Sequence, residues 1–149
     1  ASPDVGGVKR ARNFAQYFQT NMVVCDKERK RANQVESMQV IGDVEGKDVV
    51  LVDDLVDTAG TLCKAARILK EKGANTVRAI STHAVLSGNA YENIEGSELE
   101  ELIVTDTIPL KKQCSKIKVL TVAELFSGGI SKIHKHESIS PLFISKTRF

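Results

Sequence analysis

Short runs of apolar residues recur along the chain, separated by polar segments that contain glycine. The clearest run is Val49 to Val52, which is typical of a strand buried on both faces of a parallel sheet. Similar patterns predict strands at residues 22–25, 38–41, 76–82, 101–105 and 117–120. Between them, apolar residues at helical spacing predict helices near residues 8–18, 62–72 and 122–133. Because strands and helices alternate, we expect an α/β fold with a parallel sheet flanked by helices.

The last predicted helix contains two unfavourable residues, Gly128 and Gly129. Each glycine costs a helix roughly 1 kcal/mol relative to alanine. The apolar residues of this helix are expected to pack against the sheet: Val122, Leu125, Phe126, Ile130 and Ile133. His134 and His136 point in different directions on a helix, so they make a poor metal pair. We assign residues 1–137 to one domain and residues 138–149 to a tail that docks elsewhere.

The composition is that of an ordinary globular domain: 149 residues, 42% apolar and 27% charged. The formal net charge of +2 gives no argument for a nucleic-acid or membrane partner. The three cysteines are an odd number without CxxC spacing, which favours reduced thiols. No apolar run has the length of a membrane span and no signal peptide is evident. We therefore expect a soluble, cytoplasmic protein.

The beginning of the chain has the character of a strand end. Ser2-Pro3-Asp4 is followed by Gly6-Gly7 and contains no initiating methionine. We expect that the chain is part of a longer polypeptide and that the first strand is missing. Asp4 fits equally well a second strand end that faces a ligand and a simple turn with a helix cap.

The strongest candidate for chemistry is the stretch from Asp48 to Thr61. Its loop, Thr58-Ala59-Gly60-Thr61, precedes a helix, and helix starts offer unpaired N–H groups and partial positive charge to a phosphate. Asp53, Asp54 and Asp57 would repel that phosphate, so they should face sugar hydroxyls or a hydrated Mg²⁺. Together these features predict a sugar phosphate site beyond the carboxyl end of a strand. The alternative is that these residues only end a strand, cap a helix and form a turn.

Residues 26–33 form a charged run between two strands. Such a run is usually solvated surface, and a localisation or nucleic-acid patch is a second ordinary interpretation. A flexible cationic loop could also close over a polyphosphate and stabilise developing charge. His83, at the end of a predicted strand, is a candidate catalytic residue, but a structural histidine is the more common case.

Residues 52–61, Val-Asp-Asp-Leu-Val-Asp-Thr-Ala-Gly-Thr, resemble the phosphoribosyl pyrophosphate (PRPP) motif of type I phosphoribosyltransferases and of ribose-phosphate pyrophosphokinases. Six further motifs occur in family order: Ser-Pro-Asp-x-Gly-Gly-Val, Asp-Lys-x-Arg, Ile-Gly-Asp-Val-Glu-Gly, Thr-His-x-Val-x-Ser-Gly-x-Ala, Val-Thr-Asp-Thr-Ile and Ser-Ile-Ser-x-Leu-Phe. With them, nearly the entire chain resembles the carboxyl-terminal half of a bacterial-type ribose-phosphate pyrophosphokinase.

The resemblance implies a type I phosphoribosyltransferase-like sheet with a flexible catalytic loop. It also implies transfer of the β,γ-diphosphoryl group of MgATP to the 1-hydroxyl of ribose 5-phosphate, giving PRPP and AMP. The enzyme implied is a homo-oligomer, with a hexamer as the expected assembly. The roles implied are catalysis for Lys27 and Arg29, Mg²⁺ binding for Asp4, and a regulatory site for Ser138, Ser140 and Phe143. The ribose 5-phosphate site would comprise Asp53, Asp54, Asp57, Thr58, Ala59, Gly60 and Thr61.

Two features depart from the family pattern. Glu28 stands between Lys27 and Arg29, where relatives usually carry a third basic residue, and Lys30 replaces a common proline. Gly128-Gly129 replaces helix-forming residues. Two alternative functions remain open: a phosphoribosyltransferase that consumes PRPP, and a non-catalytic regulatory subunit of the synthetase, against which the intact motifs count.

Overall fold

The structure, a computed structural model, describes residues 1–28 and 37–143. A parallel four-stranded sheet has the order β3-β4-β5-β6, and β1 and β2 form a separate antiparallel pair. The strands are β1 (Val24–Glu28), β2 (Ser37–Ile41), β3 (Asp48–Val56), β4 (Thr76–Ala84), β5 (Glu101–Thr105) and β6 (Ile117–Leu120). The helices are α1 (Val8–Tyr17), α2 (Gly60–Glu71), α3 (Ala90–Glu95), α4 (Ala123–His134) and the 3-10 helix η1 (Ser140–Leu142).

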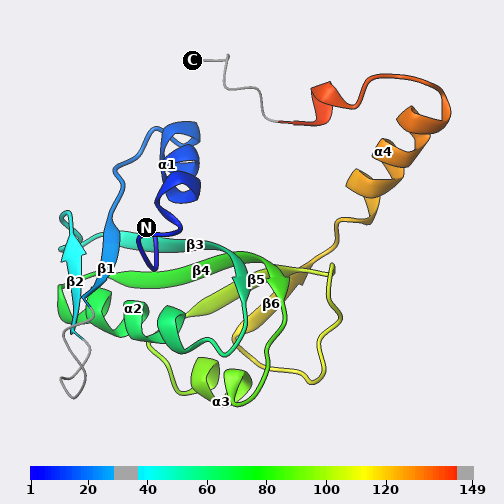
Figure 1. Cartoon of the computed structure of the whole chain (residues 1–149). Helices are drawn as coiled ribbons and strands as arrows, with labels where there is room; N and C mark the ends of the chain where they lie inside the picture. The colour runs from blue at the N-terminus through cyan, green and yellow to red at the C-terminus, as the bar shows by residue number, and fades with distance from the viewer. Residues whose placement is uncertain (29–36, 144–149) are drawn as a thin grey trace.

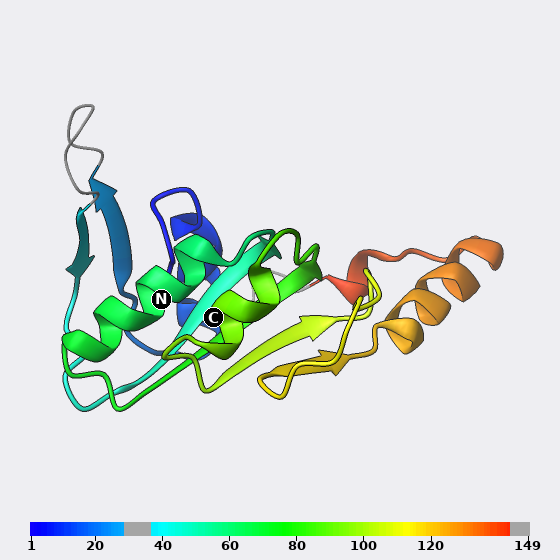
Figure 2. The same cartoon turned by 90° about the horizontal axis from the view of Figure 1, so that it is seen from below.

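The core lies between the sheet and the helices α2 and α3, which cover the same face (Figure 2). Leu51, Val77 and Leu102 project from three neighbouring strands and are fully buried, as is Leu69 of α2. Burying a leucine side chain contributes about 1.5–3 kcal/mol. The packing of α2 against β3 and β4 therefore holds the start of α2 next to the carboxyl end of β3.

On the opposite face, α1 lies over β3 (Figure 1). Only Ala11 of this helix is buried, whereas Phe14, Tyr17 and Phe18 are exposed. The helix is therefore only partly covered among the described residues, although its predicted position and amphipathic character are confirmed.

The first two residues connect the two sheets. The amino group of Ala1 donates to the carbonyl of Val50 at 2.6 Å, and the Ala1 carbonyl accepts from the N–H of Val52 at 3.0 Å. On the other side, Ser2 exchanges hydrogen bonds of 2.9 Å with Val23 and Cys25. Ala1 and Ser2 thus lie extended between β3 and β1, immediately before the turn that leads to α1.

Two predicted boundaries need correction, and one helix was missed. β3 does not stop before Asp53 but continues to Val56, because Asp53 and Leu55 pair with Ser81 and His83 of β4. β1 extends to Glu28 and pairs Lys27 with Met38, so the strand enters the run that was expected to be a loop. The short helix α3 was not predicted.

The prediction that the last helix packs against the sheet is wrong. The helix α4 forms at the expected residues, but it has no buried residue and extends away from the end of β6 (Figure 1). Its apolar side chains Leu125, Phe126, Ile130 and Ile133 are 56–65% exposed. Within the described ranges, no helix is long and apolar enough to cross a membrane.

Candidate functional site

The carboxyl end of β3 presents two adjacent carboxylates that one guanidinium bridges. Arg10 of α1 donates from Nη1 to Oδ1 of Asp53 at 2.8 Å and from Nη2 to Oδ2 of Asp54 at 2.6 Å. The side chain of Asp53 is 25% exposed and that of Asp54 is 64% exposed. The acidic edge is therefore open to solvent on the Asp54 side and is neutralised in part from the helix above it.

The two carboxyl groups titrate differently. Burial raises the pKa of Asp53, and repulsion from Asp54 acts in the same direction against the attraction of Arg10. For Asp54, slight burial also acts upward, but the hydrogen bond with Asp53 and the charge of Arg10 outweigh it and lower the pKa. As the pH falls, Asp53 thus takes up a proton before Asp54.

The loop after β3 holds the start of α2 in a conformation suited to an anion. Ala59 precedes the helix with φ of 61°, a left-handed conformation that non-glycine residues adopt rarely. The N–H of Cys63 bonds to the Ala59 carbonyl at 2.9 Å. The N–H groups of Gly60, Thr61 and Leu62 have no acceptor within the described residues. Such free N–H groups at a helix start bind phosphate.

A second loop, after β4, supports the first. The N–H of Leu86 donates to the Val56 carbonyl and that of Ser87 to the Asp57 carbonyl, both at 3.1 Å. The Ser87 hydroxyl also donates to the carboxylate of Asp57, and Asn93 of α3 donates from Nδ2 to the Thr58 carbonyl at 2.9 Å. The candidate loop from Asp57 to Thr61 is therefore held from outside by backbone and side chains.

Asp4 lies in the turn before α1. Its Oδ1 accepts the N–H of Gly7 at 2.9 Å, while the Ser2 hydroxyl donates to the Asp4 carbonyl at 2.6 Å. The turn expected in the structural alternative is thus present, but no side chain caps α1. In residues 1–28 and 37–143, no three His, Cys, Asp or Glu side chains form a group able to hold a metal. A single carboxylate still fits Mg²⁺, which commonly takes one or two protein carboxylates together with waters and substrate phosphates.

The other predicted site residues are separate from this edge or are not described. Lys27 has its backbone in β1, and Arg29 lies outside the described residues. Ser138, Ser140 and Phe143 lie after α4, at and around η1. His83 bonds through Nδ1 to the Thr107 hydroxyl at 3.0 Å, which is the structural role that lone histidines usually have.

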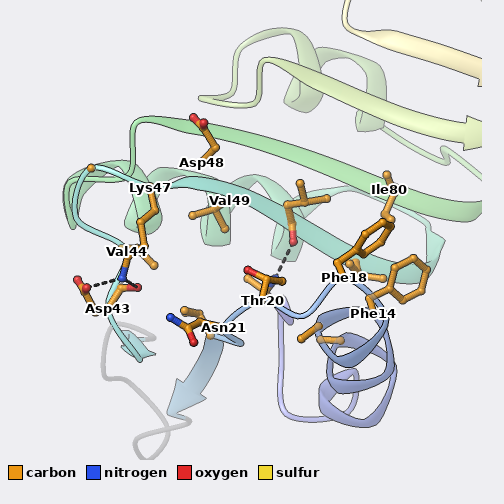
Figure 3. A pocket seen from close by; sticks show the side chains of 17 residues that line it. Phe14, Phe18, Thr20, Asn21, Asp43, Val44, Lys47, Asp48, Val49 and Ile80 are labelled. Atoms are coloured by element: carbon orange, nitrogen blue, oxygen red, sulfur yellow. Dashed lines mark hydrogen bonds and ion pairs between the residues drawn. The ribbon is translucent and has the colours of Figure 1, made fainter. Parts of the chain in front are cut away.

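A pocket of about 880 Å³ lies along the other part of β3, between this strand, α1 and the 43–47 segment (Figure 3). Phe14 and Phe18 line one end, and Asp43, Lys47 and Asp48 line the other. Ala1 borders it beside Val50. This pocket does not contain the acidic residues at the carboxyl end of β3.

Sequence reasoning missed three residues that organise the site: Arg10, Ser87 and Asn93. Arg10 was recognised only as part of the polar face of its helix. Ser87 lies in the recognised motif Thr-His-x-Val-x-Ser-Gly-x-Ala, and Asn93 follows that motif. Nothing in the spacing of either residue indicates a contact with Asp57 or Thr58. Their partners are 30 or more residues away in the sequence, and local patterns carry no such information.

The chain is similar to known proteins in both sequence and structure. Residues 29–144 match the family model described as phosphoribosyl synthetase-associated domain. The chain is 56% identical over 144 residues to a ribose-phosphate pyrophosphokinase of Wolinella succinogenes, covering 97% of this chain and 47% of the relative. It is 55% identical over 143 residues to one of Campylobacter jejuni, covering 96% and 46%.

A solved structure, phosphoribosylpyrophosphate synthetase from Mycobacterium smegmatis, superposes with a TM-score of 0.83 at 33% identity, over 91% of this chain and 44% of that one. The chain thus spans about half the length of the relatives that it matches. The predicted fold class, a parallel sheet flanked by helices, is confirmed. Since the family model matches most of the chain, the protein belongs to the phosphoribosyl synthetase-associated domain family.

Proposed function

We propose that this chain is the ribose 5-phosphate-binding, carboxyl-terminal half of a ribose-phosphate diphosphokinase. The complete enzyme would transfer the β,γ-diphosphoryl group of MgATP to the 1-hydroxyl of ribose 5-phosphate, giving PRPP and AMP. The observation that carries the proposal is the acidic edge of Asp53 and Asp54 next to the free N–H groups at the start of α2. Relatives at 50–56% identity that are named ribose-phosphate pyrophosphokinase support it.

Each part of the site suits one part of the sugar phosphate. The N–H groups of Gly60 and Thr61 and the hydroxyls of Thr58 and Thr61 would bind the 5-phosphate, because helix starts favour anions. The carboxylates of Asp53, Asp54 and Asp57 would accept hydrogen bonds from the ring hydroxyls. Held at both ends, the sugar would offer its 1-hydroxyl in a fixed direction, and such positioning supplies much of the catalysis in phosphoryl transfer.

The remaining assignments follow the resemblance. Lys27 and Arg29 would neutralise the charge on the transferring diphosphoryl group. Asp4 would be this chain's ligand to Mg²⁺, which would neutralise ATP oxygens when bound. The expected setting is a cytoplasmic homo-oligomer, with a hexamer as the expected assembly. Ser138, Ser140 and Phe143 would contribute to a regulatory site.

The proposal extends to two further contacts, one along β3 and one made by the tail. The pocket beside Ala1 borders β3, and by strand alternation the N–H of Val50 points toward it, as the N–H of Val52 points toward Ala1. We propose that a further extended segment pairs with β3 there. Residues 138–149 would pack on the remaining half of the enzyme or on a neighbouring subunit.

Binding of ribose 5-phosphate, measured by calorimetry, tests the proposed site. We expect Asp57→Ala to weaken binding about tenfold or more, since a hydrogen bond to a charged group contributes about 1.5–3 kcal/mol. Asp43→Ala is the matched control, because Asp43 is an exposed carboxylate paired with Lys47 away from this edge. Equal binding by wild type and Asp57→Ala would contradict the proposal.

A second measurement separates the reaction classes. The complete protein should form AMP from ATP and ribose 5-phosphate, whereas the 149-residue chain alone should bind the sugar weakly and not turn over. Consumption of PRPP with a base, without AMP formation, would indicate a phosphoribosyltransferase instead. Absence of both activities in the complete protein would indicate a regulatory subunit.

A further inference from the structure

Arg10 is the residue on which the acidic edge depends most. Both ion pairs that Asp53 and Asp54 make with the described residues are with this one guanidinium, through its two separate terminal nitrogens. A guanidinium presents its donors in a rigid planar fork, so one side chain can fix the directions of two carboxylates at once. Arg10 is 30% exposed and therefore partly shielded from water.

The position of Arg10 is itself fixed by the turn before α1. A Cβ atom on Gly7 would lie 2.7 Å from the hydroxyl of Ser2 and 3.5 Å from Nη1 of Arg10. Such a contact with Ser2 is closer than packed atoms allow, so a glycine is needed where α1 starts against this turn. The guanidinium thus lies between the turn that carries Asp4 and the carboxyl end of β3.

The bridging leaves part of each carboxylate available. Oδ1 of Asp53 accepts from Arg10 and also from the N–H of Asp54 at 2.9 Å, while Oδ2 of Asp54 accepts from Arg10. These contacts use Oδ1 of Asp53 and Oδ2 of Asp54, and none of them involves Oδ2 of Asp53 or Oδ1 of Asp54. Two such oxygens on adjacent residues match two neighbouring hydroxyl groups.

We propose that Arg10 is a positioning residue for the sugar site: it orients the Asp53–Asp54 pair toward a vicinal diol. The inference rests on the proposed function for the identity of the diol, which is that of ribose 5-phosphate. Arg10 acts through the two carboxylates and does not itself contact the sugar.

The surrounding charges show why one guanidinium matters here. The turn before α1 contributes Asp4 and the loop after β3 contributes Asp57, both acidic. On β4, the register partner of Asp53 is the uncharged Ser81, and His83 is opposite Leu55. Burial already raises the pKa of Asp53, so loss of Arg10 would remove the main opposing cation and raise the pKa of the pair further.

The test compares wild type with Arg10→Gln and Arg10→Lys. In Arg10→Gln we expect ribose 5-phosphate affinity to fall about tenfold or more at neutral pH, because a charge-assisted contact is lost. We also expect the pH at which half the affinity is lost to move upward by about one unit, because the unbridged carboxylates protonate more readily. Arg10→Lys keeps the charge but not the fork, so it should restore the pH profile while recovering only part of the affinity.

Arg12→Gln is the matched control, since Arg12 is on the same helix, is exposed and makes no ion pair within the described residues. The carboxyl pKa values of Asp53 and Asp54, followed by carbon-13 NMR without ligand, provide a readout independent of sugar binding. If wild type fails to bind ribose 5-phosphate but the pKa values rise in Arg10→Gln, the proposed function fails and the positioning role stands.

Unchanged carboxyl pKa values and unchanged affinity in Arg10→Gln would overturn the inference. An equal effect of Arg12→Gln would also overturn it, because net charge alone would then explain the result. Should Arg10→Gln not fold, Arg10→Lys decides: an affinity and pH profile equal to wild type in that variant would show that fork geometry is not required.

Discussion

Cys25 combines complete burial with a shifted ionisation. Its side chain is fully buried in β1, and burial raises the pKa of the thiol to about 11. Because the thiolate is the reactive form, we predict that Cys25 resists alkylation by iodoacetamide at pH 8 in the folded chain. Peptide mass spectrometry of native and urea-unfolded samples checks this; labelling of Cys25 at the same rate in both would contradict it.

The same shift predicts how stability depends on alkaline pH. The unfolded thiol ionises near 8.5, whereas the folded one ionises at about 11. The contribution of the Cys25 thiol to the free energy of unfolding is therefore fully present below about pH 8.5 and is lost as the pH rises toward 11. We expect urea midpoints to fall across this window, and to fall less in Cys25→Ala, a variant whose overall stability is lower at neutral pH.

At acidic pH the informative residue is Asp48, at the start of β3. Hydrogen bonds from Thr76 and then Asn75 lower the pKa of its carboxyl. Its stabilising effect is present above the ordinary pKa near 3.9 and is lost as the pH falls through the lowered value. We predict that Asp48→Asn has a flatter stability profile below pH 4 than wild type, measured by denaturant unfolding. An unchanged profile would contradict the prediction.

For single residues, the sequence allowed the acidic side chains of the site to be identified but not the side chains that pair with them. Asp53, Asp54 and Asp57 follow a buried run next to a glycine loop, which is a local pattern. Arg10 is 43 positions from Asp53, and its polar helix face is equally compatible with solvent. The pairing depends on how α1 lies across β3, and that placement is a tertiary property.

Among the elements, two glycines have opposite roles. Gly73 lies in the turn directly after α2 and has φ of 88°. A Cβ atom at this position would lie 3.3 Å from the side chain of Glu45. The Gly73 carbonyl accepts the N–H of Gly46 at 2.8 Å. We predict that Gly73→Ala lowers the free energy of unfolding by about 1–2 kcal/mol, because left-handed backbone is strained for alanine.

Gly128→Ala is the matched control when the free energy of unfolding of Gly73→Ala is measured. Gly128 lies inside α4, where an added Cβ meets nothing within 4 Å. Alanine favours a helix by up to about 1 kcal/mol over glycine. Since α4 has no buried residue, the substitution should slow amide exchange in α4 without changing the global unfolding energy. Equal destabilisation by the two variants would contradict this account.

The element boundaries show where local patterns are insufficient. β3 was expected to end at the first aspartate, because charged residues are rare in buried strands. It continues because β4 supplies partners up to Ala84, and the strand reaches solvent at the edge of the sheet. The helix α3 is only six residues long, too short for helical periodicity to be recognised.

At the scale of the whole molecule, the feature with the largest effect is the exposed apolar surface of α4. A groove of about 310 Å³ lies between α4 and η1 and is lined by apolar residues, among them Phe126, Ile130 and Phe143. Exposed apolar patches of this kind promote association. We predict that the chain self-associates at micromolar concentration, as measured by sedimentation velocity, and that the double variant Phe126→Glu, Ile130→Glu is monomeric.

Ser127→Glu is the control for the added charge, since Ser127 is exposed on the same helix. It should associate as wild type does. If the double variant associates equally well, the α4 groove is not responsible. The amphipathic pattern of this helix correctly predicted an apolar face, but such a pattern cannot identify what covers that face, and the sheet was the wrong choice.

The backbone of Ala1 lies between two strands, and its nitrogen donates to the Val50 carbonyl. A dye or a surface linker attached at this nitrogen would emerge inside the β-structure beside Val50. Immobilisation and fluorescence work on this chain should therefore use an engineered cysteine on the outer face of α2, with the native thiols removed.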